Sequence, residues 1–151
     1  MKLIGLYTWL IGTKAEYLKQ FSNVESLYQR SMAFWNNIEG STSLLFIAML
    51  IISILFAILY YTWWNNKPGR HYTLGSWVWF AIWACLATFI FSFGIEFFET
   101  SPDSGKEWIL IVKLSACNIL YSIVFYFLIS VIWCNFLPTN ACRIFKIGRI
   151  S

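Results

Sequence analysis

Charged side chains are scarce in this sequence of 151 residues. Only 12% of the residues are Asp, Glu, Lys or Arg, whereas soluble domains carry about 25%. So little charge cannot keep a compact chain of this size in water, which excludes a soluble globular domain, a disordered chain and a coiled coil. Four cysteines are also too few for a small disulfide scaffold.

Side chains that enzymes use are equally scarce. The only histidine, His71, follows a Pro-Gly turn and has no second metal ligand close to it in sequence. The motifs of serine hydrolases, P-loop proteins and zinc proteases are absent. The cysteines form no Cys-x-x-Cys pair, and we expect apolar fillers without disulfides if the C-terminus faces the cytoplasm. The sequence therefore predicts a protein that is not an enzyme and has no cofactor, metal, nucleic acid or evident small-molecule substrate.

What the sequence has in abundance is apolar surface. Hydrophobic residues make up 59% of the chain and aromatic residues 21%. Three stretches contain no charged residue, namely the 27 residues at positions 40–66, the 25 at positions 71–95 and the 29 at positions 114–142. Since a spanning helix needs about 20 mostly apolar residues, each stretch predicts one span. We place the spans at residues 42–64, 74–98 and 108–136.

The positive charges favour one orientation in the membrane. The turn after the first span carries Lys67 and Arg70, and the end of the chain carries three more basic residues that we expect to contact lipid headgroups, namely Arg143, Lys146 and Arg149. The positive-inside rule then places the C-terminus in the cytoplasm of a plasma or bacterial inner membrane. Counting the lysines of the N-terminal region equalises the two sides, so an N-terminal region held inside would invert this topology.

An amphipathic helix is predicted before the spans, at residues 14–36. Aromatic and apolar residues recur in it at helical spacing, namely Tyr17, Phe21, Val24, Tyr28, Met32 and Trp35. The pattern is typical of a helix that lies on the bilayer or packs on the bundle. The alternative is a docking helix for a partner protein or a second copy of the chain.

Small and polar residues form one stripe in each of the last two spans. The second span carries Ala81, Cys85, Thr88, Ser92 and Glu96, and the third carries Ser115, Asn118, Ser122, Tyr126 and Ser130. Because lipid gives helices no hydrophobic reason to associate, such stripes mark packed faces. They predict either internal helix packing or the lining of an oligomeric pore. The Asn118 amide needs a hydrogen-bond partner, which a second copy could supply.

Two charged residues lie inside the predicted spans. Glu96 and Lys113 stand on neighbouring antiparallel spans at similar depth, which predicts an intramembrane ion pair. The pair could pin the two helices together or belong to an ion or proton path. Alternatively, Lys113 could extend to the interface.

The predicted fold is all-α, with an interfacial helical region at residues 1–40, a three-span bundle at 41–137 and a basic cytoplasmic tail at 138–151. The function predicted from it is a membrane protein that self-assembles into a channel-like, pore-forming or sensor assembly. By analogy of size and architecture alone, this would be a membrane effector of the toxin or defence type. The alternative is an accessory subunit of a larger membrane complex. The partners expected are the lipid bilayer and either further copies of the chain or other membrane subunits.

Overall fold

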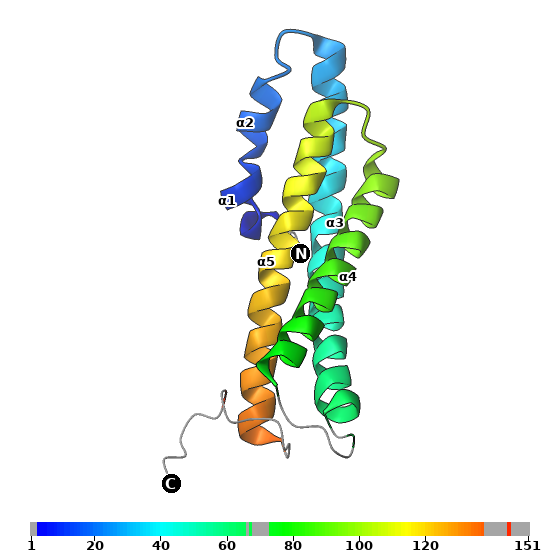
Figure 1. The fold of residues 1–151 in the computed structure, drawn as a ribbon. Helices are drawn as coiled ribbons and strands as arrows, with labels where there is room; N and C mark the ends of the chain where they lie inside the picture. Colours follow the sequence, from blue (N-terminus) through cyan, green and yellow to red (C-terminus); the bar gives the residue numbers. More distant parts are fainter. Residues whose placement is uncertain (1–2, 66, 68–72, 138–144, 146–151) are drawn as a thin grey trace. The chain divides into compact units, whose positions relative to one another are not determined.

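The computed structural model describes residues 3–65, 67, 73–137 and 145, and within this part the regular structure is helical, without strands (Figure 1). A short 3₁₀ turn, Ile4–Leu6, precedes α1 (Thr8–Ile11) and α2 (Lys14–Lys19). The long helices are α3 (Glu25–Ile58), which continues as a π-helical turn at Leu59–Trp64, α4 (Leu74–Thr100) and α5 (Gly105–Phe136). The basic tail residues Arg143, Lys146 and Arg149 lie outside the described residues.

The prediction of three helices that could cross a membrane is confirmed. Glu25–Trp64, Leu74–Thr100 and Gly105–Phe136 are each long and apolar enough to do so. The two later helices begin and end within three residues of the predicted spans. The first helix differs, because it begins at Glu25, well before the predicted start at residue 42. At 40 residues it is about 60 Å long, twice the thickness of the hydrocarbon core.

The prediction of one continuous amphipathic helix at residues 14–36 is wrong. A turn at residues 20–24 separates α2 from α3, and the Ser22 hydroxyl donates to the carbonyl of Lys19 there. Ser and Asn side chains compete with helical hydrogen bonds in this way. The pair Ser22-Asn23 therefore favours a turn, which the apolar spacing alone did not predict. The predicted boundary at residue 40 falls inside α3.

The break changes which residues share a face. Tyr17 on α2 packs on Phe34 and Trp35 of α3, with ring centroids 6.3 and 5.4 Å apart. Tyr17 and Trp35 are buried, Phe21, Tyr28 and Met32 are half-buried, and Val24 is exposed. The predicted stripe is thus folded back on itself and does not form one continuous face.

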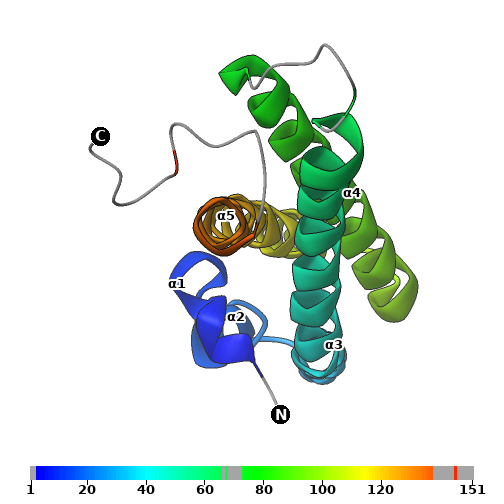
Figure 2. The same cartoon turned by 90° about the horizontal axis from the view of Figure 1, so that it is seen from below.

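The chain divides into two compact units. The first comprises the described residues of Met1–Ala48 and Phe89–Asn118, and the second those of Met49–Thr88 and Ile119–Ser151. In the first unit, α1 and α2 lie beside α5 and the N-terminal part of α3, with α4 on the other side of these helices (Figures 1 and 2). The Lys14 ammonium donates to the side-chain carbonyl of Asn36 at 2.7 Å and ties α2 to α3.

The second unit is built around aromatic rings. Tyr60 and Tyr61 of the π-helical turn are buried with their rings 4.8 Å apart, and Tyr61 stacks on Trp133 of α5 at 5.6 Å. Cys85 is a free thiol, whereas Cys134 is disulfide-bonded. The expectation that the cysteines form no disulfide is therefore wrong for Cys134.

Candidate functional site: buried polar residues and a basic pocket

Asn118 is the centre of a buried hydrogen-bonded group in the first unit. The Tyr7 hydroxyl donates to its Oδ1 at 2.8 Å, and its Nδ2 donates to the Ser92 hydroxyl at 3.0 Å. All three residues are at least 98% buried. The amide therefore links α5 to the N-terminal segment on one side and to α4 on the other. Its partners come from the same chain, so it does not need a second copy.

The same pattern continues along α5 in the second unit. The Ser122 hydroxyl lies 3.0 Å from that of Ser53 on α3 and accepts from Thr88 on α4 at 3.3 Å. Further along α5, the Trp77 indole N–H donates to the Ser130 hydroxyl at 2.9 Å. The whole α5 stripe predicted from the sequence is buried, namely Ser115, Asn118, Ser122, Tyr126 and Ser130. On α4, Thr88 and Ser92 are buried and Cys85 is half-buried.

Glu96 on α4 is fully buried and faces α3. Its Oε1 is in a short hydrogen bond with the Ser41 hydroxyl, and that hydroxyl also lies 2.8 Å from the carbonyl of Ile38. A serine hydroxyl has one hydrogen, and a carbonyl can only accept. A protonated Glu96 that donates to Ser41, while Ser41 donates to Ile38, satisfies both contacts.

The charge state of Glu96 follows from its remaining contacts. Its Oε2 has no hydrogen-bond partner among the described residues. A buried carboxylate without a cation is far more costly than a buried neutral carboxyl. The arrangement thus suits a carboxyl that keeps its proton, and the group can hold or release a proton at this place in the chain.

The predicted ion pair between Glu96 and Lys113 does not form within the described part of the chain. Glu96 bonds to Ser41, whereas Lys113 is exposed and lines a pocket on another side of α5. Similar depth on two antiparallel helices does not give the same facing direction. Lys113 stands five residues before Asn118, which turns its side chain by about 140° from the face that meets α4.

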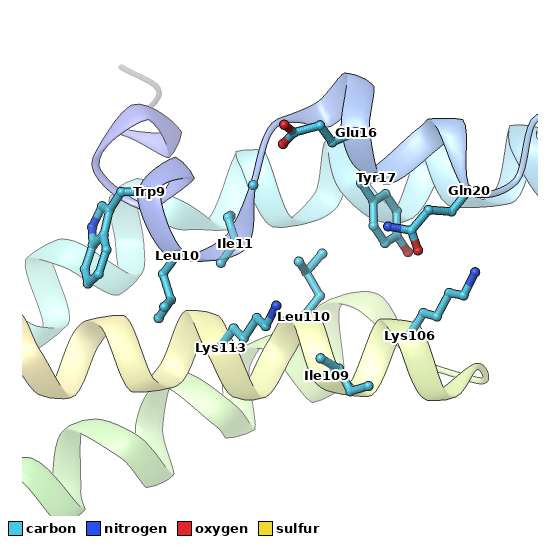
Figure 3. Close-up of a pocket in the computed structure, with 11 residues that line it drawn as sticks. Trp9, Leu10, Ile11, Glu16, Tyr17, Gln20, Lys106, Ile109, Leu110 and Lys113 are labelled. Atoms are coloured by element: carbon cyan, nitrogen blue, oxygen red, sulfur yellow. The ribbon is translucent and has the colours of Figure 1, made fainter.

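The pocket that Lys113 lines has a volume of about 420 Å³ and lies between the N-terminal segment and α5. Figure 3 shows Lys113 extending from α5 toward Leu10 and Ile11, and Lys106 extending from α5 at the other end of the pocket, toward Gln20. Lys106 also lies 4.8 Å from the centroid of the Phe21 ring. The two lysines give one side of the pocket positive charge, and the leucine and isoleucine side chains form an apolar part of the lining beside Glu16 and Gln20.

The acidic side chains near this pocket are engaged elsewhere. Glu16 accepts from the backbone N–H of Thr13 at 2.8 Å and completes a capping box at the start of α2; that bond holds the pKa of Glu16 below its usual range. Glu107 is buried and accepts from the backbone N–H groups of Asp103 and Ser104. Arg30 lies 3.6 Å from Glu107 and 2.5 Å from Asp103. The two capping carboxylates are therefore occupied, and neither forms an ion pair with Lys106 or Lys113 in the described chain.

Tyr17 closes the pocket on the α2 side. Burial, reinforced by the negative charge of Glu107, raises the pKa of its hydroxyl to about 12, so the group stays protonated at neutral pH. The hydroxyl is buried and forms no hydrogen bond of normal geometry, although Ser31 lies close by.

Sequence reasoning missed several of these residues. The pattern Thr13-x-x-Glu16, and likewise Ser104-x-x-Glu107, is the signature of a capping box and could have fixed the starts of α2 and α5. Tyr7, Ser41 and Ser53 carry no such signature. None of them belongs to a motif or a periodic pattern, and only the tertiary contacts reveal them as partners of the polar stripes.

Comparison with known proteins finds no family model, no curated protein and no solved structure that matches this chain. Any functional proposal therefore depends on the chain's own residues. Within the part of the chain that the structure describes, no cluster of three or more His, Cys, Asp or Glu residues could hold a metal ion.

The neutral form of Glu96 leads to a testable expectation. Replacing Glu96 with Gln keeps a donor for Ser41, so the free energy of unfolding should stay within about 1 kcal/mol of the unmodified chain. Replacing it with Ala removes that donor and leaves a void, at a loss of about 1–3 kcal/mol. Unfolding of the purified protein in detergent by heat or by SDS measures both values.

The matched control is Glu99→Gln, which removes an exposed carboxylate one turn away and should leave stability unchanged. If Glu96→Gln were as unstable as Glu96→Ala while the control stayed stable, the buried group would have to be a charged carboxylate.

Proposed function

We propose that this chain is a non-enzymatic integral membrane protein that serves as an accessory subunit of a larger membrane complex. The three long helices would cross the bilayer. Large apolar side chains on the outer faces of all three support insertion, because water would not tolerate so many; examples are Leu44, Ile51, Ile90, Phe91 and Val124, all more than 40% exposed.

One observation supports the accessory role over a pore. The polar side chains inside the long helices form their hydrogen bonds within the chain, through Asn118 with Ser92 and through Ser122 with Ser53 and Thr88. A pore needs such groups directed toward water between the copies. With the polar stripes used internally, most of the outer surface of the long helices is apolar, which suits lipid tails and the helices of other membrane proteins.

The self-assembling, channel-like function remains the alternative. It would require copies to meet through their apolar faces, with a lining that the two stripes do not supply. The buried Glu96 and the hydroxyl of Ser115, which has no partner among the described residues, are two polar groups in the spans that could still serve such an assembly after a rearrangement.

For the orientation we propose a cytoplasmic C-terminus, in a plasma or bacterial inner membrane. The support is the cluster of basic residues at that end, which includes Lys67 and Arg70 of the turn and the three basic residues of the tail. The extra length of α3 would then project the region around Arg30 beyond the membrane on the opposite side.

The disulfide at Cys134 provides a test of this orientation. The cytoplasm keeps thiols reduced, so a cytoplasmic C-terminus requires Cys134 to be a thiol in cells, whereas the disulfide seen in the structure would require the oxidising side. Acid quenching of living cells, followed by alkylation in denaturant with a mass-tagged maleimide, reports the state. A Cys85→Ala/Cys117→Ala background leaves only Cys134 and Cys142 to be counted.

In that background, two adducts in quenched cells are expected. Reduction before alkylation serves as the control that both sulfurs can react. No adduct without reduction, and two after it, would place this end of the protein on the oxidising side and reverse the orientation.

The accessory role predicts the stoichiometry of the purified protein and its response to Asn118→Leu. Native mass spectrometry should find single copies, alone or with a different protein, in both forms. The substitution should lower stability by about 0.6–2 kcal/mol for each hydrogen bond lost, because Tyr7 and Ser92 lose their shared partner.

Ser115→Ala is the matched control, since this buried hydroxyl on the same helix has no hydrogen-bond partner among the described residues. Crosslinking in cells should capture a second kind of membrane protein. A closed ring of four or more copies that conducts ions in planar bilayers, and whose size shifts with Asn118→Leu, would instead establish self-assembly.

A further inference from the structure

We infer that the pocket between the N-terminal segment and α5 binds the phosphate headgroup of an anionic phospholipid. The inference rests on the proposed insertion into a membrane, but it is independent of the accessory role. It starts from α5, where Lys106 and Lys113 are seven residues apart. Two helical turns bring them onto the same face, about 20° apart around the axis and about 10 Å apart along it.

The charge of this pocket selects an anion. Both lysines line it, and among the described residues neither has a carboxylate partner. Glu16, the acidic residue among the lining residues, is held by the backbone of Thr13. The pocket therefore has two ammonium groups against one carboxylate that is already bound, which favours a ligand with negative charge.

The donors fit a phosphate group. Ammonium groups on long, flexible stems can converge on one phosphate from a distance of about 10 Å. The Gln20 amide lies on the opposite wall of the pocket, beside Tyr17 (Figure 3). Together these groups offer charge-assisted and neutral hydrogen bonds from both sides of the pocket.

The apolar part of the lining identifies the source of the phosphate. Trp9 and Ile109 line the pocket and are 60% and 58% exposed, so apolar surface continues from the pocket to the outside of the chain. Leu10 and Leu110 add further apolar side chains to the lining. An acyl chain can follow this surface while the headgroup stays at the lysines, whereas a soluble anion would leave it exposed to water. Lysines near the ends of spans recognise lipid headgroups in this way.

The experiment compares lipid retention by native mass spectrometry after reconstitution in nanodiscs of phosphatidylglycerol or phosphatidylcholine. The intact chain should retain phosphatidylglycerol on the order of tenfold better than phosphatidylcholine, from two lysine contacts. Lys106→Gln/Lys113→Gln should lose this preference, because glutamine has a similar reach without the charge. Lys19→Gln, on the exposed side of α2, is the control and should retain the preference.

Inorganic phosphate separates the two sources of the anion. Added at about 100 mM, far above any tight soluble-anion affinity, it should leave the bound lipid in place. Displacement of the lipid would assign the pocket to a soluble anion and overturn the inference. Equal retention of both lipids by the intact chain, or unchanged preference in the double variant, would also overturn it.

Two further measurements keep these outcomes interpretable. Circular dichroism and thermal unfolding must match between the double variant and the Lys19→Gln control. If the double variant does not fold, the single variant Lys113→Gln replaces it in the comparison and should show an intermediate lipid preference. Alkaline carbonate extraction tests insertion separately. A chain that stays in the membrane but does not discriminate the lipids contradicts the pocket assignment alone, and a chain that is extracted contradicts the proposed function.

Discussion

The Asn118 amide is the contact on which the first unit depends. A primary amide carries both donors and acceptors, and in an apolar surrounding each unused one destabilises the folded state. Asn118 accepts from Tyr7 and donates to Ser92, so α5, α4 and the N-terminal segment must all be in place to satisfy it. The position of Tyr7 in turn sets where α1 lies, and thereby forms one wall of the basic pocket.

Helix α5 thus has two faces with different chemistry. The face with Asn118 and Ser122 meets α3 and α4 through short polar side chains, which allow close approach and hydrogen bonding between helices. The face with Lys106 and Lys113 is turned away from α4 and carries flexible cations. The polar groups on the face with Asn118 form hydrogen bonds inside the fold. In the first unit, the polar groups of α5 that can contact a ligand are therefore those on the face with Lys106 and Lys113.

The sequence predicted the long helices well because one strong rule governs them. Charge is excluded from hydrocarbon, and the spans placed from the uncharged stretches, at residues 74–98 and 108–136, agree with α4 and α5 to within three residues. The rule says nothing where charge and apolar residues mix. At residues 14–36 the apolar spacing suited one helix, yet Ser22 and Asn23 end α2 and reverse the chain. The partners of the stripes, such as Ser41 and Ser53, were beyond prediction because single serines on a long helix have no periodic signal.

The error over Glu96 and Lys113 shows which information the sequence did contain. The prediction used only the depth along two antiparallel helices, but an ion pair also requires a shared facing direction. The α5 stripe already defined the face that meets α4, and Lys113 lies about 140° from Asn118 around the axis. The same geometry places Lys106 on the side of Lys113. If the angular position around the helix axis had been considered together with depth, the sequence alone would have placed the Glu96 carboxyl and the two lysines, Lys106 and Lys113, on different sides of the helices. These are two sites with opposite requirements: the carboxyl is stable because water is excluded, and the lysines are stable because their ends remain accessible to an anion.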